Sequence, residues 1–70
     1  MPPLRDLLGD DAALRAVVAT TPPREMARRI NGAMAGALDI VDALISRIFD
    51  LYIELWGPLY AEEFRQALKR

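Results

Sequence analysis

The feature that most constrains this chain is an apolar heptad that runs from residue 27 to residue 55 without interruption. Its members follow one another at alternating steps of three and four, which places them on one stripe of a single helix. They are Ala27, Ile30, Met34, Ala37, Val41, Leu44, Ile48, Leu51 and Leu55. The dipeptide Asn31-Gly32 often marks a turn, but the heptad phase continues through it. We therefore expect one continuous helix over about residues 24–56.

Prolines and glycines mark the ends of the predicted helices. The first helical region spans about residues 4–19, with Asp10 as a plausible N-cap after Gly9. Pro22 suits the first position of the central helix, which then covers about 22–56. Gly57-Pro58 ends it, and a last helix over about 58–69 carries Leu59, Phe64 and Leu68 on one side. The sequence predicts an all-α domain of residues 1–70, a three-helix chain with one long central helix.

The buried face of the central helix is predicted to be wide. If the stripe occupies heptad positions a and d, the neighbouring e position holds Leu38, Ile45 and Tyr52. A two-stranded coiled coil carries charged residues there, whereas a wide apolar face is typical of bundles with more helices. Seventy residues bury only about 60% of the surface of the unfolded chain, and without cysteine no disulfide can add stability. We therefore expect a second molecule, with a homodimer as the leading arrangement.

The second half of the central helix is apolar on nearly every side, and we predict that it lies at an interface. The predicted interface residues are Ile40, Leu44, Ile48, Phe49, Leu51, Tyr52, Leu55, Trp56 and Tyr60. Four of them are aromatic, and tyrosine and tryptophan are enriched at binding hot spots. The same aromatic residues would also suit an ordinary core against the last helix, or a pocket for a small molecule.

The sequence offers little for catalysis or metal binding, so we expect no enzyme, no cofactor and no metal site. Histidine and cysteine are absent, Ser46 is the only serine and Lys69 is the only lysine. A nucleophilic serine therefore has no histidine partner. Asp39 and Asp42 are one turn apart and, with Asp50, could offer oxygen ligands to a hard cation. We interpret these acids as a solvated stripe of the helix.

The charge distribution argues against a membrane and only weakly for nucleic acid. The net charge is −1, and the most apolar stretch, residues 33–56, contains five charged residues that would be costly in a bilayer. The start of the chain does not resemble a signal peptide, so we expect a cytoplasmic protein. Arg24, Arg28 and Arg29 form the only basic cluster; they could contact a polyanion, or pair with nearby carboxylates such as Glu25.

The best-supported function is a small helical protein–protein interaction module, such as an adaptor, docking element, accessory subunit or inhibitor. It would act by binding a second copy or a larger protein partner through its helix faces. One alternative is a small dimeric nucleic-acid-binding regulator or antitoxin-like protein that uses the arginines. A further alternative is a binder of hydrophobic ligands. The excess of arginine over lysine and the many alanines suggest a bacterial origin.

Overall fold

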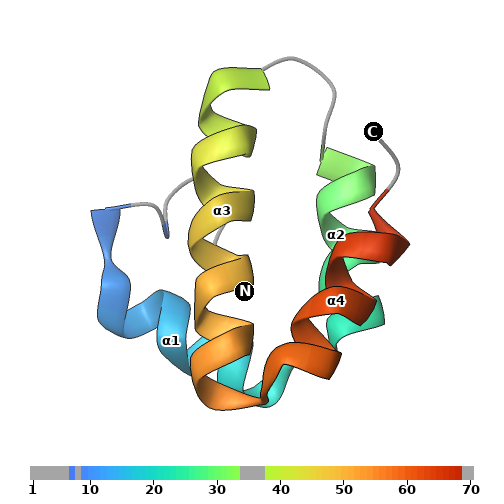
Figure 1. Cartoon of the computed structure of the whole chain (residues 1–70). Coiled ribbons are helices and arrows are strands. Elements are labelled where there is room, and N and C mark those ends of the chain that lie inside the picture. Colours follow the sequence, from blue (N-terminus) through green and yellow to red (C-terminus); the bar gives the residue numbers. More distant parts are fainter. Residues whose placement is uncertain (1–6, 8, 34–37, 69–70) are drawn as a thin grey trace.

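The computed structural model has four helices in the part of the chain that it describes, residues 7, 9–33 and 38–68 (Figure 1). They are α1 (Asp11–Thr20), α2 (Pro23–Ala33), α3 (Leu38–Leu55) and α4 (Pro58–Ala67). The prediction of an all-α fold is therefore confirmed. The prediction of three helices is wrong, because the stretch expected to form one long helix contains both α2 and α3. Over the described residues, none of the helices is long and apolar enough to cross a membrane.

The error in the long helix has a clear physical reason. Asn31 and Gly32 lie inside α2, which ends at Ala33, and α3 runs in the opposite direction from Leu38 (Figure 1). Ala27 and Ile30 of α2 are buried in the same core as the stripe residues of α3. A heptad phase identifies which residues are buried. It does not distinguish one straight helix from two helices that face a common core. The side chains of residues 33–41, which include part of the stripe, lie outside the description.

The predicted ends of the helices hold in part. The first helix, expected over about residues 4–19, begins only at Asp11 and ends at Thr20, while residues 1–6 and 8 lie outside the described part. The carboxylate of Asp10 accepts a hydrogen bond from the backbone N–H of Ala13 at 3.1 Å, which confirms it as the N-cap of α1. The carbonyl of Pro22 accepts from the N–H of Met26 at 3.0 Å, so α2 begins at Pro23, one residue later than expected. Gly57 has a φ of 109° between α3 and α4, and Pro58 occupies the first turn of α4. The predicted break at Gly57-Pro58 is thus confirmed.

The helices enclose a single hydrophobic core. α4 packs against both α2 and α3, while α1 packs against α3. Phe64 of α4 and Tyr52 of α3 are among the largest fully buried side chains. The other core residues are Leu7, Leu14, Val18, Met26, Ala27, Ile30, Leu44, Ile45, Ile48, Leu51 and Ala61. Five of the stripe residues, Ala27, Ile30, Leu44, Ile48 and Leu51, are therefore covered by the chain's own helices, whereas Leu55 is 39% exposed.

Candidate protein-binding groove

Four of the nine residues predicted at an interface lie in the interior. Leu44, Ile48, Leu51 and Tyr52 are all under a tenth exposed and belong to the core. They are covered by helices of the same chain, so in this fold they offer no surface to a partner. The prediction that they are removed from solvent fits the structure, but the covering molecule is the chain itself.

Tyr52 and Trp56, near the end of α3, form hydrogen bonds with the backbone at the end of α1. The hydroxyl of Tyr52 donates to the backbone carbonyl of Thr21 at 2.5 Å, and the indole Nε1–H of Trp56 donates to the carbonyl of Val18 at 2.9 Å. Burial raises the pKa of the Tyr52 hydroxyl well above its usual value of 10.0. The Tyr52 ring lies 5.3 Å from the Phe64 ring, centroid to centroid. Tyr52 and Trp56 therefore have a structural role inside the chain.

Four other predicted interface residues lie nearer the surface. Phe49 and Trp56 are half-buried against the core. Leu55 is 39% exposed and Tyr60 is 47% exposed, with the Tyr60 ring 5.3 Å from that of Trp56. Ile40 belongs to α3, but its side chain lies outside the described part. Among the predicted interface residues whose side chains the structure describes, Phe49, Leu55, Trp56 and Tyr60 are therefore available for contact with another molecule.

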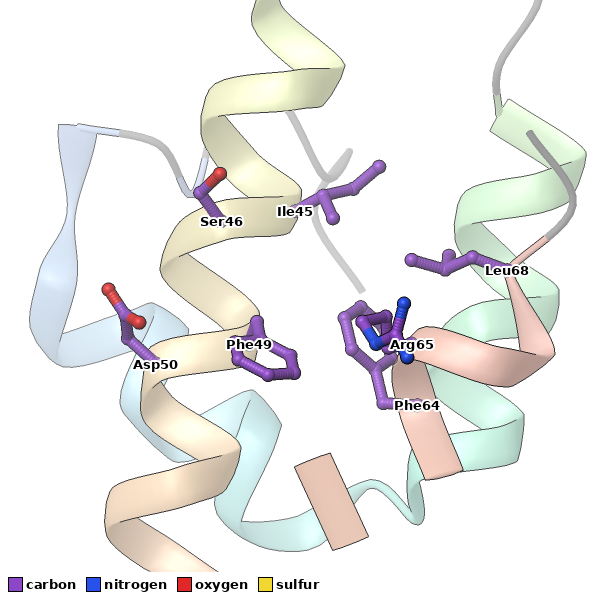
Figure 2. Close-up of a pocket in the computed structure, with 7 residues that line it drawn as sticks. All are labelled: Ile45, Ser46, Phe49, Asp50, Phe64, Arg65 and Leu68. Atoms are coloured by element: carbon purple, nitrogen blue, oxygen red, sulfur yellow. The ribbon is translucent and has the colours of Figure 1, made fainter. Parts of the chain in front are cut away.

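A concave groove lies between α3 and α4 (Figure 2). It has a volume of about 530 Å³ and is open on one side. Figure 2 shows Phe49 of α3 and Phe64 of α4 pointing toward each other across it, whereas Ser46 and Asp50 point to the side of α3 that faces away from α4. Ile45 and Phe64 are buried and form its floor, since they also belong to the core. The lining residues are Ile45, Ser46, Phe49, Asp50, Phe64, Arg65 and Leu68. We call this surface the α3–α4 groove.

The apolar lining follows the helical repeat on both walls. Ile45, Phe49 and Ile53 are spaced by four residues on α3, and Tyr60, Phe64 and Leu68 have the same spacing on α4 and at its end. Residues four apart share a helix face, so both rows run along the groove toward the Gly57 turn. Ile53 is 42% exposed and Tyr60 is 47% exposed at that end. Neither residue lines the groove itself, but each extends its apolar row with an exposed side chain, and we call these two side chains the rim.

The polar residues of the groove differ between its two walls. Asp50 is exposed on the α3 wall, beside Ser46. On the α4 wall, Arg65 forms an ion pair with Glu62, one turn earlier on the same helix. That hydrogen-bonded arginine lowers the pKa of the Glu62 carboxyl. One wall therefore presents a carboxylate and the other a guanidinium with its paired carboxylate.

Most of the groove was not predicted from the sequence. The predicted interface included Phe49 and Tyr60 but omitted Asp50, Phe64 and Arg65. The sequence does contain the two apolar rows spaced by four. These rows indicate a groove only once it is known that α4 folds back onto α3 at Gly57. Leu59, expected on the inner side of the last helix, is 84% exposed. It lies opposite the buried face that Ala61 and Phe64 define, because two residues correspond to more than half a turn.

The three arginines predicted to contact a polyanion all lie on α2, and each is near a carboxylate. Arg24 reaches Glu63 of α4 at 2.9 Å between Nε and Oε1. Arg28 and Arg29 both approach Glu25, at 3.2 Å and 3.7 Å. Pairing with Glu25 was the alternative interpretation of this cluster. Intramolecular pairing reduces the positive charge that a phosphate would encounter.

The described residues contain no group of three or more His, Cys, Asp or Glu side chains arranged to hold a metal ion. The known proteins give no further guide to function. The chain matches no family model, and neither a curated protein nor a solved structure matches it significantly.

Proposed function

We propose that this chain is a small helical protein-binding module and that the α3–α4 groove receives an amphipathic helix of a partner protein. The observation that carries the proposal is the pair of apolar rows spaced by four on facing walls. An amphipathic helix presents apolar anchors at the same spacing and is commonly bound in such grooves. Figure 2 shows the floor and walls that the anchors would contact.

The shape of the groove supports a helix over a small ligand. Its volume of about 530 Å³ is within the range of small-molecule sites. Such sites, however, surround most of the ligand surface, whereas this groove is open along one side. The exposed rim at Ile53 and Tyr60 also extends beyond what a small ligand would cover. Both features suit an amphipathic helix that inserts the side chains of one face into the groove and leaves the others in solvent.

The charges on the walls define the chemistry of the partner further. Asp50 on the α3 wall favours a lysine or arginine beside the partner's apolar face, and rim charges of this kind act mainly on specificity and association rate. Glu62 and Arg65 already pair with each other on the α4 wall, so little net charge remains there. We therefore infer a partner helix with a basic flank on the side that faces α3.

A synthetic amphipathic peptide tests this proposal. The peptide carries leucines at i, i+4 and i+7 with lysines on one flank, and a second peptide replaces those lysines with glutamates. The lysine peptide is expected to shift the amide resonances of Phe49, Asp50 and Arg65 and to bind more tightly. Shifts spread over other faces, or equal binding of both peptides, would contradict the proposed groove.

Surface variants sharpen the same test. Ile53→Ser and Tyr60→Ser are each expected to weaken peptide binding about tenfold, because loss of an interface anchor costs about 1–2 kcal/mol. Leu59→Ser is the matched control, since Leu59 is more exposed than either but belongs to neither apolar row. It should leave the affinity unchanged. If Leu59→Ser weakens binding as much as the other two, the surface is nonspecifically adhesive and the proposal fails.

A further inference from the structure

A second concave surface lies between α2 and α4 and shares no lining residue with the α3–α4 groove. It has a volume of about 310 Å³ and is lined by Arg24, Arg28, Asn31 and Ala67. The first three are spaced by four and three residues along α2, so they share one face of that helix. Ala67 ends α4, which packs against α2 (Figure 1). We call this surface the α2–α4 hollow.

The lining of the α2–α4 hollow is positively charged. Two arginines line it, and no acidic side chain is among the described residues that do so. The nearest carboxylates contact the arginines from outside the lining. Glu63 lies 2.9 Å from Nε of Arg24, and Glu25 lies 3.2 Å from Nη1 of Arg28. An anion in the hollow would therefore contact the two guanidinium groups and neither carboxylate.

The ion pairs of these two arginines are of a kind that a ligand can replace. The side chains of Arg24 and Arg28 are 80% and 79% exposed. Ion pairs at such exposed positions contribute little to stability, because water screens them and the long side chains lose freedom. A guanidinium group also has five N–H donors, so contact with one carboxylate does not exhaust its capacity. The pairing with Glu25 and Glu63 therefore reduces the charge of the hollow without closing it to an anion.

The end of α4 forms the remaining wall of the hollow. The side-chain amide of Asn31 donates to the backbone carbonyl of Ala67 at 3.1 Å. That carbonyl oxygen, which would otherwise repel an anion, thus already accepts a hydrogen bond. The carboxyl end of a helix carries about half of a negative charge, whereas the two arginines carry two full positive charges. The balance of charge in the hollow therefore favours an anion.

We propose that the α2–α4 hollow binds the phosphate group of a phosphate monoester. A phosphate monoester has three strong acceptor oxygens, so it can accept hydrogen bonds from both guanidinium groups at once. A carboxylate has two oxygens, which a single guanidinium group can satisfy. The volume is near the lower limit for small-molecule sites, which is about 300 Å³, and leaves room for an organic group beside the phosphate. A small metabolite and a phosphorylated side chain share this chemistry.

Titration with inorganic phosphate, followed by NMR, tests the proposal. The titration is done at about pH 8, where phosphate is mostly a dianion, with sodium chloride of equal ionic strength as the blank. The side-chain Nε–H resonances of Arg24 and Arg28 are expected to shift and to saturate. The amide resonances of Phe49 and Asp50, at the α3–α4 groove, should not move. Equal shifts in chloride, or shifts spread evenly over all arginines, would overturn the proposal.

Two neighbouring arginines provide a matched pair of variants. Arg28→Gln and Arg29→Gln each remove one positive charge from α2 beside Glu25, but Arg29 does not line the hollow. Arg28→Gln should weaken phosphate binding about tenfold, because charge-assisted hydrogen bonds are lost, and Arg24→Gln should do the same. Arg29→Gln should weaken binding less than about twofold, because salt screens its charge. Circular dichroism should show wild-type helix content in all three. Equal weakening by Arg28→Gln and Arg29→Gln would show attraction to net charge alone and would contradict a defined site.

Further probes identify the source of the phosphate. Phenyl phosphate and a phosphoserine peptide both carry a monoester and should bind at least as tightly as inorganic phosphate. The tighter of the two distinguishes a small molecule from a phosphorylated protein. Diphenyl phosphate, a diester with a single charge, should bind roughly tenfold more weakly. If duplex DNA binds more tightly than either monoester and its affinity falls steeply with salt, the surface contacts a polyanion and the proposal is wrong. None of these outcomes depends on peptide binding at the α3–α4 groove.

Discussion

At the residue scale, Tyr52 is the side chain on which the interior depends most. It is fully buried, contacts Phe64 and Trp56 through its ring, and satisfies the carbonyl of Thr21 with its hydroxyl. Tyr52→Phe keeps the ring but leaves that carbonyl without its donor. We expect the free energy of unfolding in urea to fall by about 1–3 kcal/mol. Tyr60→Phe, at an exposed tyrosine, should change it by less than about 0.5 kcal/mol. Similar losses for both variants would contradict the role given to the Tyr52 hydroxyl.

Gly57 is the residue whose backbone the fold constrains most. Its φ of 109° and ψ of 163° place it in a region that essentially only glycine adopts. No atom lies within 4 Å of a Cβ added there, so the cost of Gly57→Ala is conformational, and we expect a loss of about 1–3 kcal/mol. Gly32→Ala also meets no atom, but it lies in a helix and should stabilise by up to about 1 kcal/mol. Thermal unfolding of the two variants should therefore shift in opposite directions, and shifts of the same sign would refute this assignment.

At the scale of elements, the attachment of α1 to α3 should depend on pH. Arg47 lowers the pKa of Asp11, and Arg15 lowers the pKa of Glu54, mainly through hydrogen bonds to the carboxylates. A carboxyl whose pKa is lowered by folding stabilises the folded state above its usual pKa and loses that contribution as it becomes protonated. Stability should therefore decline as the pH falls through and below 4.5 and 3.8, the usual values for Glu54 and Asp11.

A double variant isolates this contribution. Arg15→Gln with Arg47→Gln removes both guanidinium groups, so the carboxyl groups should return toward their usual pKa values. The midpoint of thermal unfolding should then fall less steeply between neutral and acidic pH than in the wild type. High salt should reduce the difference between the two proteins, because both ion pairs are exposed and therefore screened. Parallel pH profiles would show that these pairs do not couple α1 to α3.

The helices also show how much of the fold could be predicted from the sequence alone. Local signals succeeded: Asp10 caps α1, and the Gly57-Pro58 break separates α3 from α4. The heptad correctly marked Ala27, Ile30, Leu44 and other residues for burial. It failed on connectivity, because a stripe in phase gives no sign that the chain reverses. That reversal depends on tertiary packing of α2 against α4, which no local pattern records.

At the scale of the whole molecule, the interface predicted from the sequence was a consequence of expecting one long helix. A long uncovered helix would have exposed Leu44, Ile48 and Leu51, so an interface there was the natural hypothesis. Folding back of the chain covers these side chains and leaves a smaller surface, the α3–α4 groove, between two helices. The sequence contained the groove's two apolar rows. Their alignment on facing walls depends on how α3 and α4 pack against each other.

The central claim is that one copy of the chain covers the stripe residues Ala27, Ile30, Leu44, Ile48 and Leu51 with its own helices. The most direct measurement is thermal unfolding by circular dichroism in samples so dilute that sedimentation gives the mass of a single copy. We predict full helical signal and a midpoint that stays constant over a roughly tenfold range of dilute concentration, because a monomer gains nothing from mass action. Loss of helix as the copies separate, or a midpoint that rises with concentration in that range, would contradict the claim.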